Sequence, residues 1–414
     1  MPSVVGCGLG LFVDSTVVTY LDHAATTALH PLAVEALAAE SQSLGNASAV
    51  HGAGRAARRV VEESRELLAA RLGADPVEVV LTGGGTEADN LAVKGLFWSR
   101  TASEPQRRRV LVSAVEHHAV LDPALWLAER AGAVVVQLPV DGTGRVDPDA
   151  LAAELAAHPD EVALVAVMWA NNEVGTVQPV ADVVELAHRY DVPVHVDAVQ
   201  AAGQLPVSFA ASGADTMAVS GHKIGGPVGI GALVVRRGLE LTPVLHGGGQ
   251  ERRMRSGTVP VALARSFAVA VDVAVAEQPE RAEHMSGLRD RLVAGVLASI
   301  PDAVVRGPWP PGQDLSTVRD RLPGNAHLTF PGCDGEALTL LLDDAGVHAS
   351  TGSACQAGVA RPSHVLLAMG VPDAVARGAL RFSFGTSSTG GDVDAVLRVL
   401  PGVVERARAV GLVR

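Results

Sequence analysis

The stretch Val162-Ala163-Leu164-Val165-Ala166-Val167-Met168 is a continuous apolar run, and a helix-like stretch at 180–190 and a second apolar run at 193–197 follow it. Short β-branched runs of this kind alternate with amphipathic helical stretches from about residue 76 to residue 235. This alternation is typical of a mostly parallel sheet with helices on both of its faces. The sequence therefore predicts an α/β fold.

The alternation places individual strands and helices. Strands are expected at 77–82, 110–114, 134–138, 162–168, 193–197, 216–220 and 230–235. Helices are expected at 86–97, 120–130 and 180–190, and a long Ala/Val-rich helix at 261–277. Beyond that helix strand candidates become fewer, which predicts a second, smaller domain from about residue 279 to the end.

Composition excludes several classes of protein. With 48% apolar and 19% charged residues, a chain of 414 residues can bury a large core and is not disordered. A net charge of −12 and 3% aromatic residues argue against a general binder of nucleic acid or anionic membranes. Arg107-Arg108-Arg109 is the only tight basic run, and we interpret it as a solvated loop before the strand at 110–114.

The sequence also bears on membrane spans, a signal peptide and patterns of cysteines. No segment reaches the ~18 to 20 consecutive apolar residues that span a bilayer. The apolar run at 4–13 is short and no Lys or Arg precedes it, which argues against a signal peptide. Cys7, Cys333 and Cys355 suit neither a disulfide framework nor a metal site. We therefore expect a soluble cytoplasmic protein of enzyme size with free thiols.

Lysine is almost absent from the chain, because only Lys94 and Lys223 occur among 33 Lys and Arg residues. An ε-amine can lose its proton and form a Schiff base, which Arg cannot do. Lys223 lies in Ser220-Gly221-His222-Lys223-Ile224-Gly225-Gly226, between an apolar segment and a glycine-rich turn. We interpret Lys223 as a cofactor-binding lysine, and Lys94, in a helix-like run, as an ordinary solvated cation.

The segment Gly83-Gly84-Gly85-Thr86 follows a predicted strand and opens a predicted helix. Glycines let backbone N–H groups approach an anion, and a helix N-terminus adds positive potential. The segment is neither a P-loop nor a dinucleotide fingerprint, because Gly-Lys-Thr is missing. It indicates a phosphate site, with a plain turn that uses Thr86 as N-cap as the alternative.

Two polar groups stand at the carboxyl ends of predicted strands, where ligands gather in open α/β sheets. Asp197, in His195-Val196-Asp197-Ala198-Val199-Gln200, either caps the next helix or pairs with a cationic ring nitrogen, as pyridoxal 5'-phosphate (PLP) requires. His117, in Glu116-His117-His118, either stacks on a flat ring and transfers protons or is a solvated loop histidine.

Cys355 lies in Ser350-Thr351-Gly352-Ser353-Ala354-Cys355-Gln356-Ala357-Gly358, whose small residues predict a mobile loop with an accessible thiol. Pro331 and Gly332 also precede Cys333, and glycines flank Cys7. Loop composition alone therefore does not choose among the three thiols.

Nine motifs occur in one order along the chain. They are Leu21-Asp22-His23-Ala24-Ala25-Thr26-Thr27, Gly45-Asn46, Thr86-Glu87-Ala88-Asp89-Asn90, Glu116-His117, Asn171-Asn172-Glu173-Val174-Gly175, His195-Val196-Asp197-Ala198-Val199-Gln200, Ser220-Gly221-His222-Lys223, Arg255-Ser256-Gly257-Thr258 and Ser353-Ala354-Cys355. In this order they resemble the cysteine desulfurases of the class V aminotransferase family, from about residue 20 to 385. The Gly352-Ser353-Ala354-Cys355 loop is similar to the group I (IscS/NifS-like) branch rather than to the SufS-like branch.

The resemblance implies a PLP-transferase of fold type I that forms a homodimer. Its large PLP-binding domain, with a mostly parallel seven-stranded sheet, would cover residues 30–278. A smaller α+β domain, made of residues 1–29 and 279–414, would carry the loop of the catalytic cysteine.

The resemblance also implies a role for each candidate site residue. Lys223 would carry PLP, Asp197 would hold the pyridinium proton, and Gln200 would hydrogen-bond the ring hydroxyl oxygen. His117 would stack on the ring and shuttle protons. The phosphate would be held by Gly85, Thr86, Ser220 and His222, with Thr258 reaching it from the partner subunit. The substrate would contact Asn46, Asn172 beside the ring, and Arg381, which would clamp its carboxylate bidentately.

The implied reaction converts L-cysteine to L-alanine and leaves a persulfide on Cys355. A protein sulfur acceptor would receive that sulfur, for an iron–sulfur scaffold, for tRNA thiolation or for DNA phosphorothioation. No direct contact with nucleic acid is expected. Alternatives are another PLP enzyme, such as a selenocysteine lyase or an aminotransferase, and a non-catalytic sulfur-relay protein.

The chain departs from the family pattern at two positions and at its N-terminus. Val228 and Thr386 stand where relatives often have Lys and Arg, respectively. Neither change removes a catalytic group. The N-terminal extension through about Thr19 is not explained by the family pattern.

Overall fold

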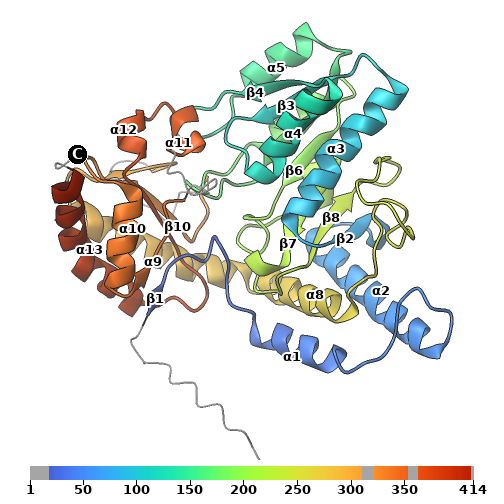
Figure 1. Ribbon diagram of the computed structural model, residues 1–414, viewed down its shortest axis with the longest axis horizontal. Coiled ribbons are helices and arrows are strands. Elements are labelled where there is room, and N and C mark those ends of the chain that lie inside the picture. Colours follow the sequence, from blue (N-terminus) through green and yellow to red (C-terminus); the bar gives the residue numbers. More distant parts are fainter. Residues whose placement is uncertain (1–17, 310–319, 353–361, 412–414) are drawn as a thin grey trace, which may run out of the picture.

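The computed structural model describes residues 18–309, 320–352 and 362–411, and seven strands within them form one large sheet (Figure 1). The strands are β2 (Val79–Thr82), β3 (Arg109–Ser113), β4 (Val134–Leu138), β5 (Val162–Met168), β6 (Val194–Asp197), β7 (Thr216–Ser220) and β8 (Gly231–Val235). Their order is β2-β8-β7-β6-β5-β3-β4, and β8 alone runs antiparallel to its neighbours. The predicted α/β class with a mostly parallel seven-stranded sheet is confirmed.

The predicted strand positions differ from the structure only at their ends. The strands at 134–138, 162–168 and 216–220 have the predicted bounds. β2 begins two residues late, because Pro76–Glu78 forms a 3₁₀ turn (η1) whose Glu78 carboxylate accepts the N–H of Asp75 at 2.9 Å. A local side-chain contact thus delays the strand.

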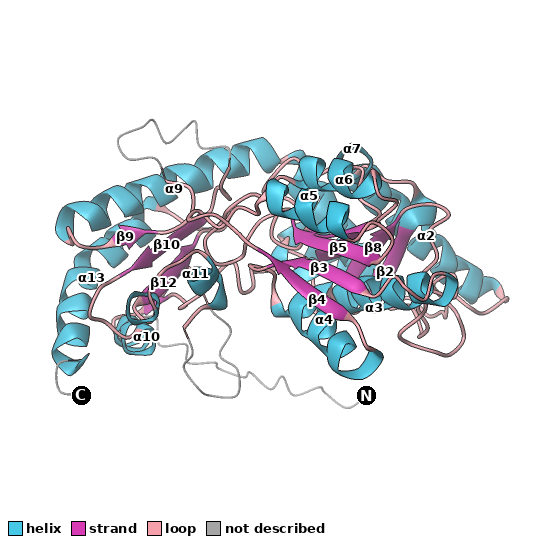
Figure 2. Ribbon diagram, turned by 90° about the horizontal axis from the view of Figure 1, so that it is seen from above, coloured by secondary structure: helices cyan, strands magenta, loops and turns pink. Residues whose placement is uncertain are grey.

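Helices cover both faces of this sheet, as Figure 2 shows. One face is packed by α2 (Gly52–Leu72), α5 (Pro148–Ala157), α6 (Val180–His188), α7 (Phe209–Ser212) and α8 (Val261–Ala276), and the other by α3 (Gly85–Ser103) and α4 (His118–Ala131). Every residue of β5 is buried, because apolar clusters lie on both of its sides. Helix α1 (Pro31–Glu40) packs against α8.

A second, antiparallel sheet lies beside the first, in the order β12-β10-β9. Its strands are β9 (Val304–Val305), β10 (Asn325–Thr329) and β12 (Ala379–Ser383), and the helices near it are α9 (Gln278–Ser299), α10 (Gly335–Asp344), α11 (His364–Ala368), α12 (Asp373–Ala376) and α13 (Gly390–Gly411). β1 (Thr19–Tyr20) pairs in parallel with β11 (Val347–His348), so the start of the described chain joins the C-terminal part. The domain limits at 29 and 278 stay a prediction.

Arg107 corrects one interpretation of the sequence. Its side chain is buried rather than solvated, since its Nε donates to Glu104 at 2.8 Å and its Nη1 donates to the carbonyl of Val162 at 3.0 Å. Arg109 is the first residue of β3. Arg107 and Arg109 are therefore attached to the large sheet, whereas Arg108 is exposed in the preceding loop.

Within the described ranges, no helix is both long enough and apolar enough to cross a membrane.

Candidate active site

The carboxyl ends of β3, β5, β6 and β7 meet the C-terminal part of the chain around one cavity of about 410 Å³. Its walls contain ten of the thirteen predicted site residues. They are Gly85, Thr86, His117, Asn172, Asp197, Gln200, Ser220, His222, Lys223 and Arg381. Because parallel strands end at the same edge of a sheet, segments more than 100 residues apart supply one site.

Lys223 is held in the cavity by main-chain oxygens. It follows β7 at the end of a 3₁₀ turn, Gly221–Lys223 (η2). Its Nζ donates to the carbonyl of Ala24 at 2.5 Å and to that of Ala25 at 2.7 Å. Burial, and next the nearby Arg381 guanidinium, lower the pKa of Lys223 to about 8. A sizeable share of this amine is therefore unprotonated just above neutral pH, as a nucleophile or base requires.

Asp197 ends β6 and is almost fully buried. Its Oδ1 accepts the N–H of Val199 at 2.8 Å. Burial, and next the Asp89 carboxyl, raise the pKa of Asp197 to about 7. A cation placed opposite Asp197 would stabilise its ionised form, because the attraction between the two charges offsets the cost of desolvating the carboxylate.

A second layer of buried polar groups lies behind Asp197. His195, two residues earlier on β6, contacts Asp89 Oδ1 through Nε2 at 3.1 Å and Thr216 Oγ1 through Nδ1 at 2.9 Å. Burial lowers the pKa of His195 to about 4, so its imidazole is neutral at physiological pH. The side chain connects α3, β6 and β7 beneath the cavity.

The N-terminus of α3 lines the cavity through Gly85 and Thr86. A Cβ on Gly85, the first residue of α3, would lie 2.7 Å from Val199 Cγ2, so only glycine fits there without a shift of Val199. Ser220 Oγ is buried and has no hydrogen-bond partner. An unpartnered hydroxyl beside the free N–H groups of a helix N-terminus suits a phosphate group.

His117 is the N-cap of α4, and its Nδ1 accepts the N–H of Ala119 at 3.1 Å. Burial, and next the Lys223 ammonium, lower the pKa of His117 to about 4. The neutral ring that results must carry its proton on Nε2, since Nδ1 is an acceptor. The expectation of a merely solvated loop histidine is therefore wrong.

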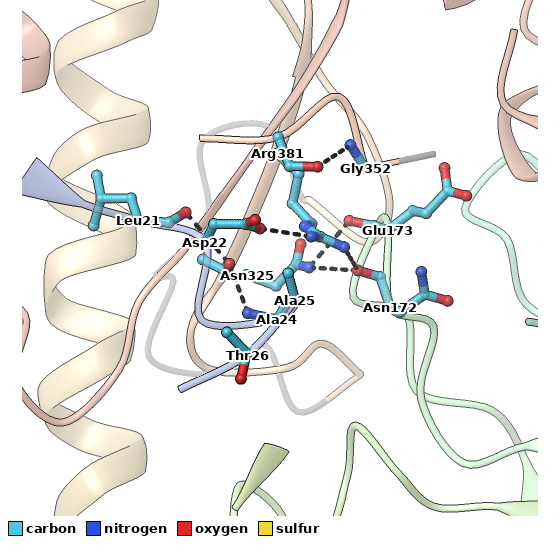
Figure 3. A network of polar contacts seen from close by, with 12 residues as sticks. Leu21, Asp22, Ala24, Ala25, Thr26, Asn172, Glu173, Asn325, Gly352 and Arg381 are labelled. Carbon is cyan, nitrogen blue, oxygen red and sulfur yellow. Dashed lines mark hydrogen bonds and ion pairs between the residues drawn. The ribbon is translucent and has the colours of Figure 1, made fainter. Parts of the chain in front are cut away.

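Arg381, on β12, approaches the cavity from the second sheet (Figure 3). Its Nη2 donates to Asp22 Oδ1 at 2.8 Å and its Nη1 donates to the carbonyl of Asn172 at 2.9 Å. Its Nε is buried without a partner. The guanidinium is thus fixed in direction by one carboxylate and one carbonyl.

The chain matches the family model for aminotransferase class-V over residues 19–396. The chain belongs to the aminotransferase class-V family. This class-V protein is 56% identical over 393 residues to an "IscS-like cysteine desulfurase" of Mycobacterium tuberculosis (strain ATCC 25618 / H37Rv), an alignment that covers 95% of this chain and 98% of the relative.

Solved structures agree with this assignment. A "NIFS-LIKE PROTEIN" has 33% identity and a TM-score of 0.83, over 94% of this chain and 100% of the other. A structure described as "SspA in complex with cysteine" has 31% identity and a TM-score of 0.73, over 90% and 100% of the two chains.

Two described site candidates of this class-V protein, Asn46 and Thr258, do not line the cavity. Asn46 is exposed in the loop between α1 and α2, where its Oδ1 accepts the N–H of Ser48 at 2.9 Å. Thr258 is exposed in the loop before α8. Cys355 lies outside the described residues, as do Cys7 and the N-terminal extension to residue 17.

Of the three cysteines, Cys333 lies within the described residues. It is buried in the apolar cluster of the second sheet, and burial raises the pKa of its thiol. A buried thiol that resists ionisation is a poor nucleophile. This environment removes Cys333 from the candidates that loop composition had left open.

The other predicted features fall outside the cavity. Lys94 is on α3, with its Nζ 4.6 Å from the ring centre of Trp126, so it packs on an aromatic ring rather than pointing freely into water. Val228 is exposed. Thr386 lines a separate, smaller cavity of about 180 Å³. Among the described residues, no group of His, Cys, Asp or Glu is arranged to hold a metal ion.

Several residues of the site were not assigned a role from sequence. Asp22, Asp89 and Glu173 each lie inside one of the nine motifs, but a motif does not say which distant residue each one meets. Glu173 accepts a hydrogen bond from Ser363 Oγ at 2.5 Å, and His364 Nε2 contacts the carbonyl of Glu116 at 2.9 Å. These two contacts attach the start of α11 to the cavity wall.

Proposed function

We propose that this protein is a cysteine desulfurase, which converts L-cysteine to L-alanine and transfers the sulfur to Cys355. The observation that carries the proposal is one cavity that combines the Lys223 amine, the Asp197 carboxyl and the Arg381 guanidinium. The relative at 56% identity is named a cysteine desulfurase, and the solved structure of SspA is described in complex with cysteine.

The residues of the cavity fit PLP as the cofactor. The N-terminus of α3 and the unpartnered Ser220 hydroxyl would hold its phosphate. Asp197 would face its ring nitrogen, and the ring cation would relieve the cost of ionising this buried carboxyl. When bound, PLP supplies a protonated ring that takes up electron density from the substrate Cα.

Lys223 has two tasks in the proposed reaction. Its Nζ would attach the cofactor and, once released by the substrate amine, would remove the proton from the substrate Cα. The pKa of about 8 matches a base that works near neutral pH. The carbonyls of Ala24 and Ala25 keep this amine directed into the cavity.

His117 and Gln200 would orient the cofactor ring. A neutral His117 can stack on a flat ring and offer the proton on Nε2, since its Nδ1 is occupied by Ala119. Gln200 donates through Nε2 to the carbonyl of Ala24 at 2.9 Å, which places its amide at the same wall as Lys223. We propose that it hydrogen-bonds the ring hydroxyl oxygen.

Arg381 would bind the substrate carboxylate, with Asn172 beside it. The guanidinium is buried, its direction is fixed by two partners, and a planar fork of donors matches a carboxylate. The Cys355 thiolate would then attack the substrate sulfur. The S–S bond forms as the Cβ–S bond breaks, and protonation of the three-carbon product gives L-alanine and a Cys355 persulfide.

We further propose that the enzyme acts as a cytoplasmic homodimer and passes its sulfur to a protein acceptor. The exposed loop with Thr258 would reach the phosphate site of the partner subunit. The net charge of −12 disfavours direct delivery to nucleic acid and favours a protein acceptor. Cys333 is a free and buried thiol, which suits a reducing compartment.

The decisive experiment compares two thiol variants. Wild type, Cys355→Ser and Cys333→Ser are incubated with L-cysteine, and L-alanine release and protein persulfide are both quantified. We expect Cys355→Ser to lose both products. Cys333→Ser should retain them, since Cys333 is buried in the apolar cluster of the second sheet. Wild-type alanine release by Cys355→Ser would exclude the proposed sulfur transfer. Consumption of cysteine by wild type without alanine release would instead favour an aminotransferase.

A further inference from the structure

The turn that begins at Asp22 contacts two cations that line the cavity, Lys223 and Arg381. Its carbonyl groups at Ala24 and Ala25 accept the two hydrogen bonds from Lys223 Nζ, and its first side chain, Asp22, accepts the hydrogen bond from Arg381 Nη2. Figure 3 shows Asp22 and Arg381 facing each other, with Ala24 and Ala25 on the same short segment. One turn therefore sets the positions of the base and of the carboxylate-binding group.

The Asp22–Arg381 pair is largely removed from solvent. The Arg381 side chain is 5% exposed and the Asp22 side chain is 23% exposed. Water and salt therefore screen this interaction weakly. Any carboxylate that approaches Arg381 meets a guanidinium whose charge Asp22 already balances, and it is repelled by Asp22 itself.

The turn does not depend on the Asp22 side chain for its shape. The N–H groups of Ala25 and Thr26 donate to the main-chain carbonyl of Asp22, at 3.0 and 3.4 Å. The Tyr20 hydroxyl donates to the same carbonyl at 3.1 Å, and the N–H of Ala24 donates to Ser383 Oγ at 2.9 Å. The Asp22 carboxylate can therefore be changed while these contacts remain.

We propose that Asp22 is a specificity-determining residue, which fixes the direction of Arg381 and competes with the substrate carboxylate for its guanidinium. The inference rests on the proposed function, because it assumes that Arg381 binds the carboxylate of L-cysteine. Asp22 thereby keeps the affinity for amino acids below the value that Arg381 alone would give, and it leaves amines without a carboxylate unaffected.

The test replaces the charge of Asp22 and keeps its shape. Asp22→Asn retains a side-chain oxygen that can accept from Arg381 Nη2, and Asp22→Ser is a second uncharged variant. Asp302→Asn is the matched control, because Asp302 Oδ2 pairs with Arg408 Nη2 at 2.7 Å in an ion pair remote from the cavity. Thermal unfolding of all four PLP-loaded proteins checks that they are folded.

Three quantities are measured: the KM for L-cysteine, and the dissociation constants of L-alanine and of ethylamine, from the visible absorbance of bound PLP. In both Asp22 variants we expect KM and the L-alanine constant to fall by about 3- to 10-fold, the effect of removing one nearby like charge. We expect the ethylamine constant to change by less than about 2-fold, and Asp302→Asn to match wild type.

A rise of KM in Asp22→Asn and Asp22→Ser would overturn the proposal, because Asp22 would then only position Arg381. Equal changes for L-alanine and ethylamine would also overturn it, because the effect would not act through the carboxylate. If wild type itself neither binds L-alanine nor turns over L-cysteine, the proposed function fails, and the inference fails with it.

Discussion

Glu87 Oε1 accepts a hydrogen bond from Arg255 Nε at 2.7 Å, and Oε2 of the same carboxylate accepts the N–H of Gly83 at 2.7 Å. Glu87 is in the first turn of α3, beside Thr86, and Arg255 begins the motif that ends at Thr258. One carboxylate thus connects the glycine turn of the proposed phosphate site with the loop that we expect to reach the partner subunit.

Glu87→Gln should weaken PLP binding without unfolding the protein. The change removes a partly buried ion pair and loosens the glycine turn, so we expect the PLP dissociation constant to rise by about 3- to 10-fold. The constant is measured by titrating cofactor-free protein with PLP.

Glu104→Gln is the control for this change, because Glu104 follows the other end of α3 and pairs with Arg100 and Arg107. An unchanged PLP affinity in Glu87→Gln, or an equal loss in Glu104→Gln, would contradict a local role of Glu87.

Gly85→Ala should also weaken PLP binding, for a steric reason. The new Cβ would lie 2.7 Å from Val199 Cγ2, and a β-branched side chain has few rotamers with which to escape. We expect a loss of about 10-fold in affinity. The double variant Gly85→Ala/Val199→Ala should regain most of the lost PLP affinity. If it does not, the contact between the new Cβ and Val199 is not the cause of the loss.

The pH response of Lys223 can be followed directly, because the chain has only one other lysine. In cofactor-free protein, reductive methylation of Lys223, read by mass spectrometry, should rise with a midpoint near pH 8. In the unfolded chain the same residue should respond with a midpoint near ~10.4. A folded-state midpoint as high as that of the unfolded chain would show that burial does not activate this amine.

The lowered pKa of Lys223 also makes the stability of the cofactor-free protein depend on pH. The pKa of Lys223 is lower in the folded state than in the unfolded chain, so the unfolded state binds more protons between about pH 8 and ~10.4. The contribution of Lys223 to the free energy of unfolding of the cofactor-free protein therefore increases as pH rises through this window.

The raised pKa of Asp197 should change the free energy of unfolding in the opposite direction as pH rises. Its pKa of about 7 lies above the ordinary value of 3.8, so the folded state holds a proton that the unfolded state releases between these pH values. Stability from this group is thus lost as pH rises from about 4 to 7. Asp197→Asn should raise the free energy of unfolding of cofactor-free protein by about 2–4 kcal/mol at pH 8 and far less at pH 4.

The matching control is the PLP-loaded protein, in which the cationic ring offsets the ionised carboxylate. There Asp197→Asn should destabilise rather than stabilise, and it should weaken PLP binding. Thermal or urea unfolding at both pH values checks the four cases. Stabilisation by Asp197→Asn in the presence of PLP would argue against the proposed pairing.

The strands of the large sheet were predictable because their apolar runs are local signals of the right length. β5 and β7 have the predicted bounds, whereas the start of β2 depends on the contact between Glu78 and Asp75. The glycine turn that opens α3 was also predictable, since glycines before a helix are a local signal, and its binding of phosphate stays a prediction. The buried polar residues behind the cavity could not be predicted, because their partners are distant in sequence.

Asp22 illustrates this limit. Its ion pair with Arg381 spans 359 residues, and no local pattern relates the two positions. Cys333 is a second case, since its neighbours suggest an open loop while the fold buries its side chain. Burial and pairing of this kind depend on tertiary packing.

The large separation of Asp22 and Arg381 also has a consequence for biosynthesis. The sheet that supplies Lys223 and Asp197 is complete once β8 has left the ribosome, at residue 235, but Arg381 follows almost 150 residues later. Until β12 joins β10, Asp22 has no guanidinium partner. A nascent or C-terminally shortened chain would hold the amine that we propose binds PLP without the guanidinium that we propose selects amino acids. Substrate selection should therefore be the last property that the growing protein acquires.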